Sequence, residues 1–275
     1  MRTNPSIFRE YDIRGIAGRD YDEGFVEALG RAYGTKLVAE KIKRVAVGRD
    51  CRLSSPGYHE VLMKAIRDAG VDVVDVGRCP TPLLYFAIHH LDLMGGIQVT
   101  GSHNPPDHNG FKICIGKSTI HGDGIQELRR IMEAGDMARG EGSRESYPII
   151  PAYRGYVEEQ FGRIGEGVKV VVDSGNGTAG EVAPDLYRAI GCEVVDLYSE
   201  PDGSFPNHHP DPAVEENLVE LKEAIREHRA EVGIAFDGDA DRVGLVDEKG
   251  RVIWGDEMLV IFARDILAGN PGATV

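Results

Sequence analysis

The chain contains two copies of one pattern of strands and helices, and this internal repeat limits its fold more than any other feature of the sequence. Residues 45–76 and residues 170–197 each read as a strand, a loop, a helix and a second strand. Each helix ends at a glycine, Gly70 or Gly191, a residue that commonly follows the last helical turn. Strands that alternate with helices are typical of βαβ units, so we expect mostly parallel sheets covered by helices.

The two copies also carry a polar loop at the same place. A third strand of the first copy, residues 96–99, continues into a loop that contains a serine, residues 100–104. The corresponding strand of the second copy, residues 233–236, continues into an acidic loop, residues 237–241. Ligand sites in open α/β sheets favour the loops beyond the carboxyl ends of strands. We therefore expect the two loops to form complementary halves of one site.

The serine loop, residues 100–106 (TGSHNPP), has the composition of a sharp turn. Its glycine and prolines favour a tight bend in which the Ser102 hydroxyl can be exposed. A serine hydroxyl needs a base or a charged neighbour to act as a nucleophile, and His103 and Lys112 are the local candidates. The alternative is a structural turn in which Ser102 and Asn104 cap the backbone. The Gly-x-Ser-x-Gly elbow of esterases is absent.

The acidic loop places Asp237, Asp239 and Asp241 at alternate positions after an apolar strand. Carboxylate oxygens at this spacing suit Mg²⁺ or Ca²⁺, and a solvated acidic turn is the plain alternative. An EF-hand loop would put Glu248 at its twelfth position, but its sixth position would be Arg242 instead of glycine. A haloacid-dehalogenase phosphatase also begins with Asp-x-Asp after a strand. That alternative leaves the third carboxylate and the serine loop unexplained.

These loops, together with residues 8–15 (FREYDIRG) and 109–112 (NGFK), resemble the α-D-phosphohexomutase family, of the bacterial and archaeal phosphomannomutase/phosphoglucomutase type. The resemblance implies two similar three-layer α/β domains built on mixed, mostly parallel sheets, followed by the start of a third domain. It also implies an intramolecular phosphotransferase. Such an enzyme interconverts hexose 1-phosphate and hexose 6-phosphate, of mannose or glucose, through a phosphoserine and a bisphosphate intermediate.

The resemblance assigns roles to individual residues. The expected catalytic residues are Ser102, which would carry the phosphoryl group, His103, Lys112 as a general acid/base, and Arg14. The residues expected to contact phosphate or to support those that do are Tyr11, Arg49, Asn104 and Arg242. One Mg²⁺ per chain would be held by Asp237, Asp239, Asp241 and Ser102. Hexose 1,6-bisphosphate would serve as activator and intermediate.

The net charge of −14 argues against nucleic acid and anionic membranes as partners. The same charge would repel a phosphosugar substrate, so the site needs the local cations that Arg14, Lys112 and Arg242 would provide. No apolar stretch approaches the ~20 residues of a membrane-spanning helix. The N-terminus lacks the apolar core of a signal peptide, and we expect a cytoplasmic protein.

Domain boundaries follow from composition and from the repeat. A segment rich in Gly, Ser, Arg and Glu, residues 135–147, predicts a domain connection, and a helix at residues 152–161 opens the second domain. We place the first domain, with the serine loop, at residues 1–148. The second, with the acidic loop, is placed at residues 149–254. The first helix of a third domain is expected within residues 255–275.

A helix at residues 256–267 is apolar nearly all round and would normally be buried in a core. It is followed by the apparent start of a strand at residues 273–275. The family's sugar-recognition and phosphate-clamp loops, which belong to its third and fourth domains, are absent from this sequence. We therefore expect the helix to fray, to fold back on the second domain, or to pair with another chain. An alternative function follows: an incomplete two-domain fragment that binds Mg²⁺ and phosphate only.

Overall fold

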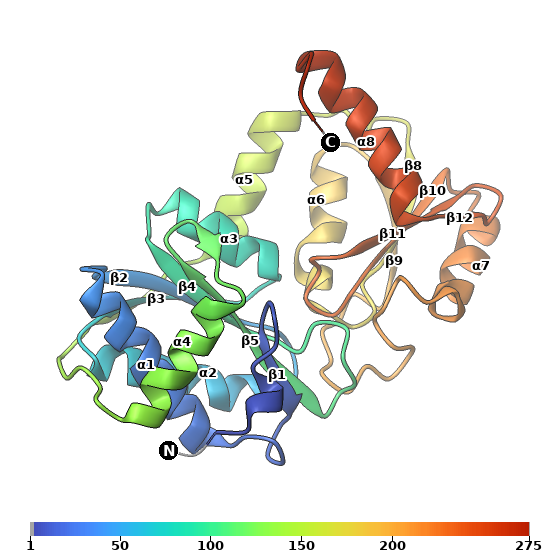
Figure 1. The fold of residues 1–275 in the computed structure, drawn as a ribbon. Helices are drawn as coiled ribbons and strands as arrows, with labels where there is room; N and C mark the ends of the chain where they lie inside the picture. The colour runs from blue at the N-terminus through green and yellow to red at the C-terminus, as the bar shows by residue number, and fades with distance from the viewer. Residues whose placement is uncertain (1–2, 275) are drawn as a thin grey trace.

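The computed structural model describes residues 3–274 and contains two sheets, each with helices on both faces (Figure 1). The strands of the first sheet are β1 (Ile13–Ile16), β2 (Arg44–Arg49), β3 (Asp72–Arg78), β4 (Gly95–Val99), β5 (His108–Ile115), β6 (Ser118–Thr119) and β7 (Arg144–Ser146). Its helices are the short η1 (Pro5–Ile7), α1 (Glu23–Ala39), α2 (Ser55–Asp68), α3 (Thr81–His90) and α4 (Asp123–Ala134).

The second sheet contains β8 (Lys169–Asp173), β9 (Glu193–Leu197), β10 (Val232–Phe236), β11 (Val243–Asp247) and β12 (Val252–Ile253). The helices of this part are α5 (Ile149–Phe161), η2 (Thr178–Glu181), α6 (Ala183–Ala189), η3 (Glu215–Leu218), α7 (Val219–His228) and α8 (Gly255–Gly269).

The two sheets share one topology, which confirms the repeat. The first sheet has the order β1-β5-β4-β2-β3-β7, with β6 paired to β5, and the second has the order β12-β11-β10-β8-β9. Within these, β5-β4-β2-β3 corresponds to β11-β10-β8-β9, and each corresponding pair has the same direction. In the first sheet β4, β2, β3 and β7 are parallel, and in the second sheet β10, β8 and β9 are parallel, whereas β5 and β11 pair antiparallel with their neighbours. Two α/β domains with mixed sheets are therefore present, as expected.

Alternation along the strands produces the three layers of each domain. In β2, Val45 and Val47 face a core formed with α1, α2 and α4, whereas Ala46 faces the opposite core formed with α3. In β8, Val171 packs toward α7, whereas Val170 and Val172 pack toward α6. Because both faces of each sheet are covered, the polar loops emerge at the strand ends, where a site can be open to solvent.

The segment between the domains differs from the prediction. Residues 144–146, expected within the connection, form β7 and pair in parallel with β3. This strand is short, polar and exposed at the sheet edge, so it carries no apolar alternation that sequence patterning could detect. Helix α5 begins at Ile149, three residues before the predicted start, and lies between α3 and α6 (Figure 1). The domain boundary between residues 148 and 149 stays a prediction.

Helix α8 forms where the sequence predicts it and extends two residues further, to Gly269. None of its residues is buried, and five large apolar side chains are half exposed or more: Leu259, Val260, Ile261, Phe262 and Ile266. The helix therefore does not bury its apolar side chains in the second domain. Residues 273 and 274 are not in a strand, and Val275 lies outside the described residues.

Candidate active site

The serine loop and the acidic loop meet, as the repeat predicts. The first connects β4 to β5 and the second connects β10 to β11, so they are corresponding loops of the two domains. Ser102 Oγ donates a hydrogen bond to Asp237 Oδ2 at 2.7 Å. The serine is 1% exposed and lies at the junction of the two domains.

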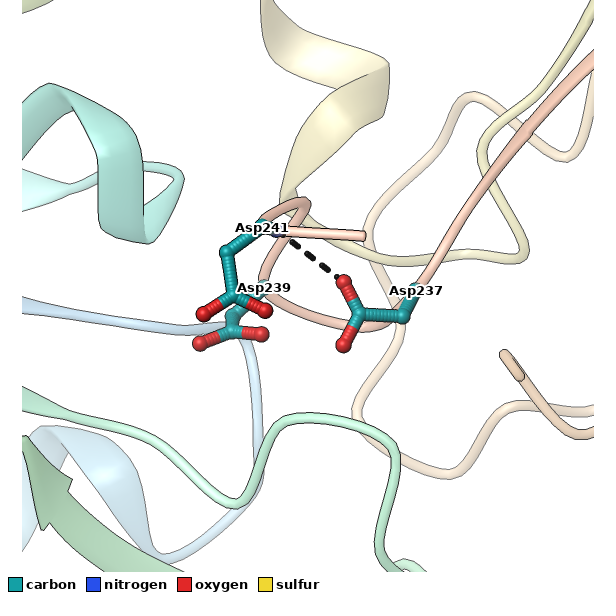
Figure 2. A group of neighbouring side chains, drawn as sticks. All are labelled: Asp237, Asp239 and Asp241. Atoms are coloured by element: carbon teal, nitrogen blue, oxygen red, sulfur yellow. Dashed lines mark hydrogen bonds between the residues drawn. The ribbon is translucent and has the colours of Figure 1, made fainter. Parts of the chain in front are cut away.

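The three aspartates of the acidic loop form a compact cluster. Figure 2 shows the carboxylates of Asp237, Asp239 and Asp241 turned toward a common centre, and one oxygen from each lies within 4.8 Å of the others. Asp237 and Asp239 are buried, whereas Asp241 reaches the surface. The flanking β10 and β11 are strands, so the EF-hand alternative, which needs helices, is excluded.

One carboxylate oxygen of the cluster lacks a hydrogen-bond partner among residues 3–274. Asp239 Oδ2 accepts hydrogen bonds from Thr81 Oγ1 at 2.5 Å and from Lys112 Nζ at 2.7 Å. Its other oxygen, Oδ1, is buried and has no hydrogen-bond partner among residues 3–274. A buried carboxylate oxygen without a partner is costly. A hard cation bound between the three carboxylates would satisfy it, and the all-oxygen donor set fits Mg²⁺.

The charges of the cluster are strongly coupled to their surroundings. Burial, followed by the charges of Asp239 and Asp241, raises the pKa of Asp237 well above its usual value. Burial also acts to raise the pKa of Asp239, but Lys112 and Thr81 outweigh it and hold that pKa at about 2. Three carboxylates at this spacing therefore need compensating positive charge.

Lys112 provides part of that charge. Its side chain comes from β5 and contacts both Asp239, at 2.7 Å, and Asp241. Burial lowers the pKa of Lys112, but these two carboxylates more than reverse the effect and leave the pKa raised. Lys112 is therefore a charged ammonium group that donates hydrogen bonds to both carboxylates.

His103, the next residue of the serine loop, has its Nδ1 3.3 Å from Ser102 Oγ. Burial, with the nearby charges of Arg242 and Arg14, lowers the pKa of His103. The imidazole is thus neutral at pH 7 and able to accept a proton. This geometry supports His103 as the base that assists the Ser102 hydroxyl.

Arg14 reaches the same region from β1, which pairs with β5 and so lies beside the serine loop. It is 7% exposed, and its Nη1 donates to Asn104 Oδ1 at 3.1 Å while Nη2 donates to Asp12 Oδ2 at 2.5 Å. Its Nε has no partner among the described residues. Two of its nitrogens therefore hold Arg14 in place, and its Nε can donate a further hydrogen bond.

A cavity of about 490 Å³ opens above Ser102. Its lining consists of Arg9, Glu10, Tyr11, Asp12, Arg14, Tyr85, Ser102, His103, Asn104, Lys112, Thr119, Asp241 and Arg242. The sequence-predicted Tyr11 lies at its mouth, 74% exposed. The four cations of the lining, Arg9 among them, provide the local positive charge that an acidic protein needs to bind a phosphorylated ligand.

One predicted residue lies elsewhere, and two residues of the site were not predicted. Arg49 is not part of the cavity lining, and its Nη1 donates to the carbonyl of Asp50 at 3.0 Å. Thr81 starts α3 in the first domain yet binds Asp239 in the second, through its hydroxyl and its backbone N–H. Arg52 donates a hydrogen bond to the carbonyl of Ser102, in the serine loop. The run Gly48-Arg49-Asp50 with Arg52 marks a strand end, but sequence alone does not show which arginine reaches the loop.

Comparison with known proteins decides the family. Residues 5–139 match the phosphoglucomutase/phosphomannomutase alpha/beta/alpha domain I, and residues 155–250 match domain II of the same family. The chain belongs to the phosphoglucomutase/phosphomannomutase family. The resemblance seen in the sequence is thereby confirmed, and the dehalogenase alternative is wrong. Both matches fall inside the predicted domains.

Relatives of known name support the assignment. A phosphomannomutase/phosphoglucomutase of Pseudomonas aeruginosa is 46% identical over 98% of this chain and 58% of its own length. A phosphoglucomutase of Neisseria gonorrhoeae is 43% identical over 98% of this chain and 59% of its own. A crystal structure of a family protein from Burkholderia thailandensis superposes with a TM-score of 0.95, at 43% identity, over 99% of this chain and 61% of that one. The chain thus spans about three-fifths of the relatives it matches.

Proposed function

We propose that this chain provides the phosphoryl-transfer part of a hexose phosphomutase. Such an enzyme interconverts the 1-phosphate and 6-phosphate of glucose or mannose. The observation that carries the proposal is the contact of 2.7 Å between Ser102 Oγ and Asp237 Oδ2 at the base of a cationic cavity. It brings a nucleophile to a cluster of oxygen ligands, which is the arrangement that phosphoryl transfer through a phosphoserine requires.

The proposed cofactor is Mg²⁺, held by Asp237, Asp239 and Asp241 together with an oxygen on Ser102. The unpartnered Oδ1 of Asp239 supports this assignment. When bound, the ion neutralises the carboxylates against the phosphoryl group and polarises the phosphorus. Backbone contacts within the acidic loop orient the first of these ligands, since Asp237 Oδ1 accepts from the N–H groups of Asp241 and Arg242, both at 3.1 Å.

The other residues act on protons and on phosphate oxygens. His103 takes the proton from Ser102 Oγ when the serine attacks phosphorus, and it returns the proton when the serine leaves. Arg14 and Arg242 bind oxygens of the transferring group, because both line the cavity next to the serine. Lys112, charged and beside the acidic loop, exchanges a proton with the sugar hydroxyl that receives or releases the phosphoryl group.

Three further features complete the proposal. Hexose 1,6-bisphosphate loads Ser102 with phosphate and is also the intermediate of each turnover. The exposed apolar side chains of α8 give the chain a surface for self-association, which sedimentation of the wild type beside Phe262→Glu would reveal as a loss of dimer. Within the described residues, the helices are too short or too polar to cross a bilayer. A cytoplasmic location stays a prediction.

The decisive experiment is to incubate the chain with glucose 1,6-bisphosphate and Mg²⁺ and to locate the phosphate by mass spectrometry. We expect one phosphate on Ser102 and none on the Ser102→Ala variant. Ser174→Ala is the matched control, because Ser174 is also a buried serine just beyond a strand end, in the other domain. Phosphate on another residue, equally abundant in Ser102→Ala, would contradict the proposal.

A further inference from the structure

Arg52 is buried completely, although it is charged and among the largest side chains of the structure. It lies just after β2, and its guanidinium is enclosed by the serine loop. Nη2 donates to the carbonyls of Ser102 at 2.7 Å and Asn104 at 2.6 Å. Nη1 donates to the carbonyls of Pro105 at 2.5 Å and His108 at 2.9 Å. One side chain therefore binds three carbonyl groups of the serine loop and a fourth at the start of β5.

The buried charge is balanced from the same segment. Arg52 Nε lies 3.2 Å from Asp50 Oδ2, and that oxygen also accepts from the N–H of Gly101 at 3.0 Å. Gly101 lets the loop close around the guanidinium, because a Cβ at this position would lie 2.4 Å from Arg52 Nε. A buried ion pair with this many hydrogen bonds fixes a geometry more than it adds stability. What it fixes here is the backbone on both sides of Ser102.

The second domain contacts the same guanidinium. The ring of Phe205, in the loop after β9, lies with its centroid 5.2 Å from Arg52 Cζ, within the range of a cation–π interaction. Gly203 of that loop packs against the backbone, since a Cβ there would lie 2.6 Å from the carbonyl oxygen of Cys51. The loop that carries Phe205 is thus docked closely on the segment that carries Arg52.

A series of contacts links the loop that carries Phe205 to the acidic loop. Asn207 Nδ2 donates to Asn176 Oδ1 at 2.7 Å, and in the same turn Thr178 N donates to the carbonyl of Gly238 at 3.1 Å. Gly238 lies against the serine loop, because a Cβ on it would be 2.5 Å from the Ser102 carbonyl oxygen. The Ser102 carbonyl is therefore held between Arg52 on one side and the acidic loop on the other.

We propose that Arg52 is a positioning residue for phosphoryl transfer at Ser102, and that Phe205 sets its guanidinium relative to the second domain. The proposal rests on the proposed function, and it adds to that function a residue, Arg52, that does not line the cavity. Ser102 has a φ of 52°, which a residue with a Cβ adopts only when its surroundings enforce it. Arg52 enforces it through the carbonyls of the loop and so fixes where Oγ lies relative to Asp237.

The test compares Arg52→Lys and Phe205→Leu with two matched controls remote from the site. Lysine keeps the charge but has one nitrogen, so it cannot bind four carbonyls at once. Arg31→Lys is its control, because Arg31 also donates to backbone carbonyls, those of Asp68 and Ala138. Phe86→Leu is the control for Phe205→Leu. Phe86 packs against aromatic rings of its own domain and of α5.

Two measurements are made on each folded variant. The rate of Ser102 phosphorylation by glucose 1,6-bisphosphate should fall roughly 100-fold in Arg52→Lys, as expected when a reacting group is displaced by about 1 Å. It should fall about tenfold in Phe205→Leu, with the half-saturating bisphosphate concentration within about twofold of wild type because the cavity lining is intact. Backbone amides of residues 100–108 should exchange with deuterium faster in both variants and remain unchanged in both controls.

Each outcome is decisive. A normal rate per folded molecule, or unchanged exchange of residues 100–108 in Arg52→Lys, overturns the positioning role. If Arg52→Lys does not fold, Phe205→Leu decides, and wild-type behaviour of that variant in both measurements overturns the proposal. If the wild-type serine takes up no phosphate, the proposed function fails, and the exchange data alone then decide whether Arg52 fixes the loop.

Discussion

Ser102 and Ala240 occupy the corresponding loops of the two domains, and both have a left-handed backbone, with φ of 52° and 56°. Such values are uncommon for residues with a Cβ and store strain that the surrounding contacts must offset. In each loop the turn directs side chains from the strand end toward the other domain. The two residues therefore place the same uncommon backbone conformation at corresponding points of the site.

The affinity for Mg²⁺ should fall when one charged ligand of the acidic loop is removed. We expect Asp239→Asn to raise the dissociation constant for Mg²⁺ by at least about tenfold, or 1.4 kcal/mol, because a charged oxygen ligand is lost. Isothermal titration calorimetry gives this constant directly. Glu248→Gln removes the same charge from the neighbouring β11–β12 turn and should leave it unchanged. The interpretation would be wrong if both variants bound Mg²⁺ like the wild type.

A partly buried histidine should make stability depend on pH. His208 Nε2 lies 3.0 Å from Asp173 Oδ2, and although burial lowers the pKa of His208, this carboxylate outweighs burial and raises it above 6.5. A raised folded-state pKa stabilises the protein fully below the unfolded-state pKa and less as pH rises through the folded-state value. The free energy of unfolding should therefore fall as the pH rises above about 6.5.

Urea unfolding at several pH values tests this expectation. His208→Gln should remove this part of the pH dependence and cost about 1–3 kcal/mol at pH 6, since a hydrogen bond to a buried carboxylate is lost. His209→Gln replaces the adjacent histidine, outside the pair with Asp173, and is the control. A His208→Gln curve parallel to the wild-type curve between pH 6 and pH 8 would show that the pair does not titrate.

At the scale of secondary-structure elements, α1 and α2 pack closely against each other. Gly30 and Gly34 lie one turn apart on α1, where a Cβ would come within 2.7 Å of the Ala65 Cβ and 2.5 Å of the Ala69 Cβ, respectively. Small residues on both helices let the two backbones approach each other. This contact positions α2, which follows directly from the segment that carries Arg52.

Two glycine substitutions in helices should therefore have opposite effects. Gly34→Ala should lower the free energy of unfolding by about 1–3 kcal/mol, because the added methyl overpacks the contact between α1 and α2. Gly155→Ala in α5 should raise it by about 0.5–1 kcal/mol, because nothing lies within 4 Å of the new Cβ and glycine is a poor helix former. Urea midpoints measure both. A gain in stability for Gly34→Ala would contradict the packing.

At the scale of the whole molecule, polar contacts tie the two domains together around the site. Lys112 and Thr81 of the first domain bind Asp239 of the second. Arg78 at the end of β3 forms a bidentate ion pair with Glu181 of η2, at 2.6 and 2.7 Å. These pairs are polar, so they hold the two half-sites in register through directional bonds.

Turnover should be limited in a polypeptide of these 275 residues. We expect Ser102 to accept phosphate but mutase turnover to be at least about 100-fold below that of the full-length Pseudomonas aeruginosa relative, which is longer than the aligned region. Residues of the first two domains line the described cavity. Contacts that position the sugar for reaction supply much of the rate of such an enzyme. A coupled assay with glucose 1-phosphate and mannose 1-phosphate measures the turnover. Rates equal to that relative would disprove the expectation.

The sequence determined the features that depend on local pattern. Apolar periodicity and helix-ending glycines reveal the repeat, and corresponding polar loops after β4 and β10 follow from it, because side-chain alternation and turn chemistry act over a few residues. Ser102 and the three aspartates were identified in this way, and the structure brings them together. The polar edge strand β7 could not be predicted, because backbone pairing with β3 fixes it and its side chains show no pattern.

The tertiary structure decided which distant residues complete the site. Thr81 and Asp239 are 158 positions apart, and Arg52 meets Phe205 only because a loop of the second domain docks on the end of β2. No local signal distinguishes Arg52 from Arg49, since both lie at the carboxyl end of β2 and only the packing of the serine loop buries one of them. Packing, burial and charge balance act between elements that are far apart in the sequence, and for that reason these contacts leave no local pattern in it.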